Sequence, residues 1–253
     1  MLRRSTSPCT GDLETLLVVS SSYGMPIANM RRVPADAIVR KSRRGYVSGT
    51  RTERAQKTRS RVIEAATRLF VQRGYATTTI RAIAAEAGVS VPTVELLFGT
   101  KAQLLHVVID VAIAGDDEPV PVLSRAWAAD VQSVRDLADF LSVVAHVVSQ
   151  AQARSAGVIL AAYEAAASDP DIQLLILDRE SQRERTATWI VDGVLERAAL
   201  RPGLDRAGAI DTVWLLMDPV IFNRFTRHRG WSPDRYASWF ADSITRLLTS
   251  DLP

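Results

Sequence analysis

Residues 78–105, TTIRAIAAEAGVSVPTVELLFGTKAQLL, decide the fold of this chain. They predict two short helices joined by a tight turn at Gly88, followed by the capped start of a third helix. Thr78 and Thr79 are candidate caps of the first helix and Ser90 of the second, because a hydroxyl accepts a hydrogen bond from an unpaired amide of the first turn. This is the layout of a helix-turn-helix, whose second helix enters the major groove of DNA.

The second short helix has an inner and an outer side. Its inner positions, by helical spacing, are Val94, Leu97 and Phe98. Its outer positions are Val91, Pro92, Thr93, Glu95 and Leu96. Three core helices of any all-α protein could show the same periodicity. Such ordered turn and cap residues within so short a span favour the helix-turn-helix.

An amphipathic helix is predicted before this motif, over residues 53–73. Its apolar face contains Val62, Ile63, Ala66, Leu69 and Phe70. Gly74 ends the helix. Together with the motif it forms a three-helix module that can bury a small core, and we expect this module to occupy residues 51–100.

Charge is distributed unevenly along the chain, whose total net charge is only +3. Residues 1–106 contain 17 Lys and Arg against 7 Asp and Glu, a net charge of +10. Residues 107–253 contain 14 against 21, a net charge of −7. A basic end is attracted to phosphates because binding releases counterions. The asymmetry supports nucleic-acid binding without identifying a family.

Residues 69–105, LFVQRGYATTTIRAIAAEAGVSVPTVELLFGTKAQLL, resemble the DNA-binding domain of TetR-family transcriptional regulators. The run RHRGWSPDRYASWFADSITRLL at residues 227–248 resembles a recurrent terminal segment of one branch of that family. The resemblance implies an all-α protein in which the three-helix head sits on a helical body, here residues 101–253. It also implies that the body binds a small-molecule effector and forms a homodimer through the last two helices.

The expected contacts with double-stranded DNA come from the motif and the resemblance together. The resemblance carries over four positions that match the family pattern, namely Thr79, Arg81, Thr93 and Lys101. The whole expected set is Thr78, Thr79, Arg81, Ser90, Val91, Pro92, Thr93, Glu95 and Lys101.

Glu95 departs from the family pattern, which often has at this position an aromatic residue whose hydroxyl touches a phosphate. A carboxylate is repelled by phosphates and cannot take that role. It could instead accept a hydrogen bond from a cytosine amine in the major groove. A salt bridge to Arg81 or Lys101, or simple solvation, is the alternative. The family also often has Tyr or His where Leu96 and Leu97 stand.

The body is predicted to be helical throughout, because Ala- and Leu-rich periodic runs dominate and strand signals are scarce. A linker containing Trp127 is expected after Gly115. The expected body helices cover residues 101–114, 133–153, 156–167, 171–200, 206–217 and 219–229, with a last helix capped by Ser232 and begun by Pro233.

An effector pocket would be lined by apolar walls and a few polar or bulky groups. The candidates on the body helices are His146, Tyr163, Trp189 and Trp214. Ordinary core or surface positions are the alternative for each of them. The last helix carries an apolar stripe formed by Tyr236, Trp239, Phe240, Ile244 and Leu247. Intramolecular packing could account for this stripe, but the resemblance favours a dimer interface.

No catalytic or cofactor-binding motif stands out, so we expect neither an enzyme nor a cofactor. The three histidines lack metal-ligand spacing, and the single Cys9 excludes an internal disulfide and a cysteine-based zinc site. The adjacent acids Asp116 and Asp117 are expected to be solvated in the linker. The apolar runs are interrupted by polar residues, which predicts a cytoplasmic protein without a membrane span.

Residues 1–50 mix Ser, Pro, Gly and Arg without sustained periodicity and are expected to form a basic, mostly disordered leader. The segment RKSRRGYVSGTRTER could lie along DNA as a basic arm. The leader could equally result from an overcalled start codon, with translation beginning at Met25 or Met30.

These features together predict a sequence-specific DNA-binding transcriptional regulator. A repressor that a small-molecule effector releases from a palindromic operator is the first hypothesis. The rival is an architectural, nucleoid-type DNA-binding protein that has no effector.

Overall fold

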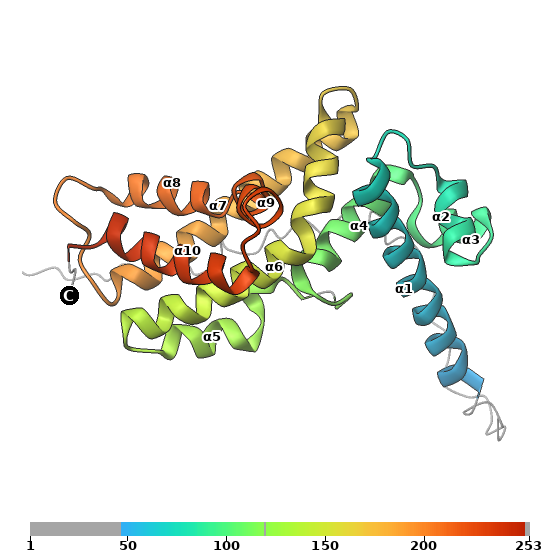
Figure 1. Cartoon of the computed structure of the whole chain (residues 1–253). Coiled ribbons are helices and arrows are strands. Elements are labelled where there is room, and N and C mark those ends of the chain that lie inside the picture. The colour runs from blue at the N-terminus through green and yellow to red at the C-terminus, as the bar shows by residue number, and fades with distance from the viewer. Residues whose placement is uncertain (1–46, 119, 251–253) are drawn as a thin grey trace, which may run out of the picture. The chain divides into compact units, whose positions relative to one another are not determined.

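The computed structural model describes residues 47–118 and 120–250, with side chains from residue 52 onward (Figure 1). The predicted leader, residues 1–50, lies outside the described residues except for its last four, which begin the first helix. The described chain is helical, as predicted, and its one β-type pairing is an isolated bridge between Leu200 and Thr249.

The head and the helix that follows it consist of α1 (Val47–Arg73), α2 (Ile80–Ala87), α3 (Val91–Phe98) and α4 (Lys101–Ala114). The rest of the body consists of η1 (Val122–Ser124), α5 (Ala126–Ser133), α6 (Leu137–Ala166), α7 (Pro170–Leu195), α8 (Arg206–Leu216), α9 (Pro219–Asn223), the π-helical turn η2 (Arg224–His228) and α10 (Pro233–Leu248).

The caps predicted for the helix-turn-helix are present, with one exception described below. Thr79 caps α2 and Ser90 caps α3, each through its side-chain oxygen. Thr100 and Gln103 form the predicted capping box at the start of α4. Gly88 ends α2 with φ 64°, a left-handed conformation that favours glycine.

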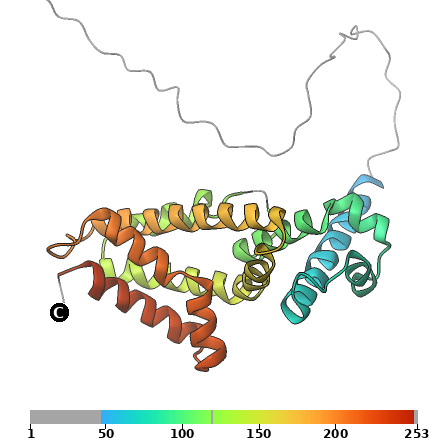
Figure 2. The same ribbon diagram turned by 90° about the horizontal axis from the view of Figure 1, so that it is seen from above.

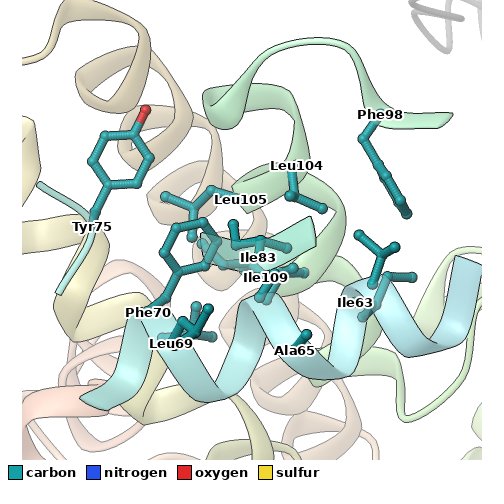
Figure 3. Packing of buried hydrophobic residues seen from close by; sticks show 14 of the residues in the cluster. Ile63, Ala65, Leu69, Phe70, Tyr75, Ile83, Phe98, Leu104, Leu105 and Ile109 are labelled. Atoms are coloured by element: carbon teal, nitrogen blue, oxygen red, sulfur yellow. The ribbon is translucent and has the colours of Figure 1, made fainter. Parts of the chain in front are cut away.

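The head is held together by a hydrophobic core to which α1 to α4 all contribute (Figure 3). Phe70 and Tyr75 lie ring against ring, with their centroids 5.8 Å apart. The same cluster continues into α6 and α7, where Val158 and Ile172 are fully buried. The helix α4 therefore belongs to the core of the head and also packs on the body.

A second core fills the body between α5 and α10. Figures 1 and 2 show α10 running beside α6, and these two helices pack extensively against each other. Tyr236, Phe240 and Ile244 of α10 are fully buried there. The hydroxyl of Tyr236 donates to the carbonyl of Leu216 at 2.7 Å, which fixes α10 against the end of α8.

Several boundaries predicted for the body are wrong, and α7 ends at Leu195 instead of at residue 200. A helix break was predicted between Ala153 and Ala156, but α6 continues through this region. Ser155 lies inside the helix, where its hydroxyl is satisfied by donating back to the carbonyl of Ala151 at 2.8 Å. The predicted linker contains η1 and α5, and Ser133 ends α5 instead of starting α6, which Asp136 caps. These errors arose because short polar residues can also lie inside or at the end of a helix.

Within the described residues, no single helix has the length and apolar composition needed to cross a membrane. The bent pair formed by α3 and α4 meets these requirements only when both parts are counted together.

Gly193 is predicted to be essential for packing in the body. A Cβ atom at this position of α7 would fall against the ring of the fully buried Phe140. Gly193→Ala should therefore lower the free energy of unfolding by about 1–3 kcal/mol, as overpacking of cores does. Urea denaturation would measure it. Adding Phe140→Leu should recover part of the loss, and equal stability of Gly193→Ala and the wild type would contradict the predicted clash.

Candidate nucleic-acid interface

The helix α3 presents one side to the head core and the other to solvent. Val94 is fully buried and Phe98 is 7% exposed. Pro92, Glu95 and Leu96 are exposed on the outer side. Leu96 is 87% exposed, which is the highest value among the exposed large hydrophobic residues of the described chain. The predicted sides are thus confirmed at these five residues, whereas Val91, predicted on the outer side, is half-buried and packs on the head core.

The hydroxyl groups at the starts of α2 and α3 face outward and organise the caps. The Thr79 hydroxyl accepts from the amide of Ala82 at 3.1 Å. The Ser90 hydroxyl accepts from the amide of Thr93 at 3.3 Å and lies 2.8 Å from the hydroxyl of that residue. Helix starts of this kind carry partial positive charge, which suits an approaching phosphate.

Thr78 does not belong to the DNA-facing surface, contrary to prediction. It is 1% exposed, and its hydroxyl donates to the carbonyl of Gly74 at 2.7 Å and lies 3.2 Å from that of Leu69. Its role is to satisfy backbone carbonyls at the turn between α1 and α2. Val91 is also a weak candidate, because it is half-buried and packs on the head core.

Glu95 makes neither of the ion pairs considered as alternatives. In the described chain, no ion pair joins its carboxylate to Arg81 or Lys101. Arg81 is exposed near the start of α2, where its guanidinium can approach a phosphate. Glu95 is exposed on α3, so solvation and base reading remain the two roles compatible with its position.

Lys101 is fixed between the head and the start of α4. Its ammonium donates to the carbonyl of Tyr75 at 3.0 Å and lies 4.0 Å from the centre of that ring. Burial lowers the pKa of Lys101, and the negative charge of Asp169 partly offsets this effect. Burial also raises the pKa of Tyr75 to about 12, with Asp169 contributing in the same direction. Lys101 therefore combines a structural role with its candidate role at DNA.

Arg59 is a residue of this region that the sequence did not single out. Its guanidinium lies 4.7 Å from the ring centre of Phe98, at the end of α3. It also forms a two-point ion pair with Asp117, at 2.5 and 3.0 Å. Asp117 follows α4, so Arg59 of α1 links the segment after α4 to Phe98 at the end of α3. Arg59 and Asp117 are 58 residues apart in the sequence, so the sequence pattern gave no signal of their pairing.

The prediction that Asp116 and Asp117 are merely solvated is therefore wrong. Asp117 pairs with Arg59, and Asp116 pairs with Arg125 at 2.6 and 2.8 Å. The hydrogen bond from Arg125 is the main cause that holds the pKa of Asp116 below its usual value.

The four predicted pocket residues do not form one group. Tyr163 and Trp214 both contact Arg183, which is 4.1 Å from the ring centre of Trp214 and 3.4 Å from the hydroxyl of Tyr163. Trp189 packs instead against Trp127, with ring centres 6.1 Å apart. His146 is exposed on α6, so it belongs to the surface.

Arg183 is the centre of a polar cluster inside the body. It pairs with Glu180 at 2.5 Å and with Asp218 at 3.0 Å, and its side chain is 10% exposed. The hydroxyl of Tyr163 donates to Glu180 at 2.7 Å. The Nε atom of Arg183 is buried and has no hydrogen-bond partner among the described residues. The cluster thus retains one unused donor.

An open apolar depression lies elsewhere on the body, between α8, α9, η2 and α10. It is lined by Leu215, Leu216, Ile221, Arg224, Phe225, Arg229 and Trp239. None of the four predicted pocket residues lines it.

The head of this chain is similar to the DNA-binding domains of known regulators. Residues 62–108 match the family model described as "Bacterial regulatory proteins, tetR family". The HTH-type transcriptional regulator TtgR of Pseudomonas putida is 45% identical over 58 residues, which are 23% of this chain and 28% of that protein. The probable regulator ArpR of Pseudomonas putida gives the same values. The chain thus aligns with less than a third of the length of these curated relatives.

Solved structures match over most of the chain and show the same fold. NalD of Pseudomonas aeruginosa, the secondary repressor of the MexAB-OprM multidrug efflux pump, is 20% identical, with a TM-score of 0.58 over 78% of this chain and 100% of its own. A putative regulator from Saccharomonospora viridis in complex with choline has the same identity and coverage, with a TM-score of 0.57. FadR of Bacillus subtilis in complex with stearoyl-CoA is 17% identical, with a TM-score of 0.54 over 74% of this chain and 97% of its own.

Lys101→Ala is predicted to weaken DNA binding across sequences and to reduce the slope of log affinity against log salt by about one, if its charge meets a phosphate. Fluorescence anisotropy at several salt concentrations would measure both quantities. Arg185→Ala, which removes an exposed charge from α7, is the matched control. An unchanged slope would assign Lys101 to the contact with Tyr75 alone.

Proposed function

Residues 62–108 form a TetR-family DNA-binding domain on a helical body of the TetR fold, and from this premise we propose a sequence-specific transcriptional repressor. It binds a palindromic operator as a homodimer in the cytoplasm and is released by a small-molecule effector. The observation that carries this proposal is the outer side of α3, which is exposed and flanked by the capped helix starts. In a dimer, two such helices enter successive major grooves about 34 Å apart.

The proposed dimer forms through apolar side chains that remain exposed on α8 and α10. Tyr236, Phe240 and Ile244 are occupied within the chain's own core, so this part of the predicted stripe is intramolecular. Leu215 of α8 is 54% exposed and Leu247 of α10 is 43% exposed. Together with the apolar depression, these side chains support a contact with a second copy.

The proposed response to an effector passes through α4 and the segment after it. The helix α4 shares a core with the head, and Asp117 holds Arg59 against the end of α3. The polar cluster at Arg183 supports a position for the effector between α6, α7 and α8, because Arg183 keeps an unpaired buried donor. An effector can release the protein from DNA only by binding the arrangement that does not fit the operator more tightly than the arrangement that does.

The rival function is an architectural DNA-binding protein. Selection of bound sequences from a random DNA pool by the full-length protein separates the two. The repressor should enrich a palindrome with half-sites about one helical turn apart. Enrichment of no sequence would reject the repressor and favour the rival, which binds through phosphates alone.

Leu215→Glu is predicted to dissociate the dimer, because it buries a carboxylate in an apolar contact. Sedimentation velocity should show monomers, and affinity for the whole palindrome should fall at least tenfold. Leu174→Glu is the matched control, since Leu174 is 66% exposed on α7, outside the proposed interface. A dimer that persists with Leu215→Glu would place the interface elsewhere.

Asp117→Ala is predicted to change DNA affinity more than stability. The ion pair with Arg59 is partly exposed, so its loss should cost less than about 1 kcal/mol of unfolding free energy. Arg59 lies on Phe98, so loss of the ion pair should leave the end of α3 less firmly held. Operator affinity should then fall severalfold. Asp242→Ala, which breaks the exposed pair with Arg246 on α10, is the control. Equal operator affinities for both variants and the wild type would exclude this coupling.

A further inference from the structure

The position of Leu96 on α3 has a simple geometric cause. Leu96 lies two residues after the fully buried Val94 and two residues before the buried Phe98. Successive residues of an α-helix are separated by about 100°, so a residue two positions away points about 200° around the axis. Leu96 therefore points directly away from the core of the head, which agrees with its exposure of 87%.

The neighbours of Leu96 on the outer side extend this apolar ridge. Pro92 precedes it by four residues, at the spacing that places side chains on the same face, and it is exposed. Thr93 precedes it by three residues, and its hydroxyl lies 2.8 Å from the hydroxyl of Ser90 within the cap. Part of the hydrogen-bonding capacity of Thr93 is thus used inside the protein.

Glu95, by contrast, lies at the edge of this ridge. It is adjacent to Leu96 in sequence and is therefore about 100° away around the helix axis. The middle of the outer side consists of a proline and a leucine, with the one carboxylate displaced to a flank. A surface of this kind offers little hydrogen bonding to base edges at its centre.

The major groove presents one apolar group to such a surface, the C5 methyl group of thymine. Resting on the proposed DNA-binding function, we propose that Leu96, supported by Pro92, is a specificity-determining residue that recognises thymine methyl groups in the operator. An exposed leucine on the outer side of α3 loses contact with water on binding where a methyl group of the groove meets it. The half-site is accordingly thymine-containing where the middle of α3 faces the bases.

The test uses the full-length protein and the operator obtained by sequence selection. Each thymine of a half-site is replaced in turn by deoxyuridine, which removes the methyl group and keeps the base pair. Removal of one buried methyl group should weaken wild-type binding about fourfold. Leu96→Ala should bind the thymine operator more weakly and should be insensitive to the same replacement.

The controls distinguish the possible failures. Leu174→Ala, at an exposed leucine on α7, should keep both the wild-type affinity and the sensitivity to deoxyuridine. If no deoxyuridine weakens wild-type binding, or if Leu96→Ala remains equally sensitive, Leu96 does not read methyl groups although the protein reads DNA. If selection enriches no sequence, the proposed function itself fails, and the role of Leu96 fails with it.

Discussion

The burial of α4 from two directions is the constraint on which the rest of the structure depends. Leu104, Leu105, Val108 and Ile109 are all fully buried on this one helix. They share a cluster with α1 to α3 and also with α6 and α7. Because close-packed interiors resist graded deformation, α4 can change position only by moving between discrete packings. The position of the head therefore depends on how α4 packs against α6 and α7.

Arginines of α6 and α7 hold the C-terminal end and one side of α4. Arg154 of α6 donates to the carbonyls of Ala112 and Ile113 at 3.0 and 2.9 Å, where the last turn of α4 has carbonyls without helical partners. Arg179 of α7, which is 7% exposed, binds Asp110 and lies 2.8 Å from His106. Because Arg179 is buried, loss of its partners would leave an unpaired charge in the interior, so these contacts hold α4 in one packing against α6 and α7.

The features that sequence analysis predicted correctly depend on residues that are close together in the chain. The caps at Thr79 and Ser90 and the turn at Gly88 depend on residues within a few positions of one another, and all three are present. Thr78 was misassigned because its partner carbonyls lie in the preceding turn, where the chain folds back on α1. The pairing of Arg59 with Asp117 could not be predicted, since it depends on the tertiary path of the chain.

The two kinds of contact expected at the operator differ in their dependence on salt. Contacts of Arg81 or Lys101 with phosphates release counterions and weaken as salt rises. An apolar contact of Leu96 releases none, and burial of a methyl group is not weakened by screening. Glu95 is an exposed carboxylate on α3, which phosphates repel, so we expect few phosphate contacts from the middle of this helix. Its discrimination between sequences should therefore be retained at salt concentrations that have already weakened its affinity for DNA in general.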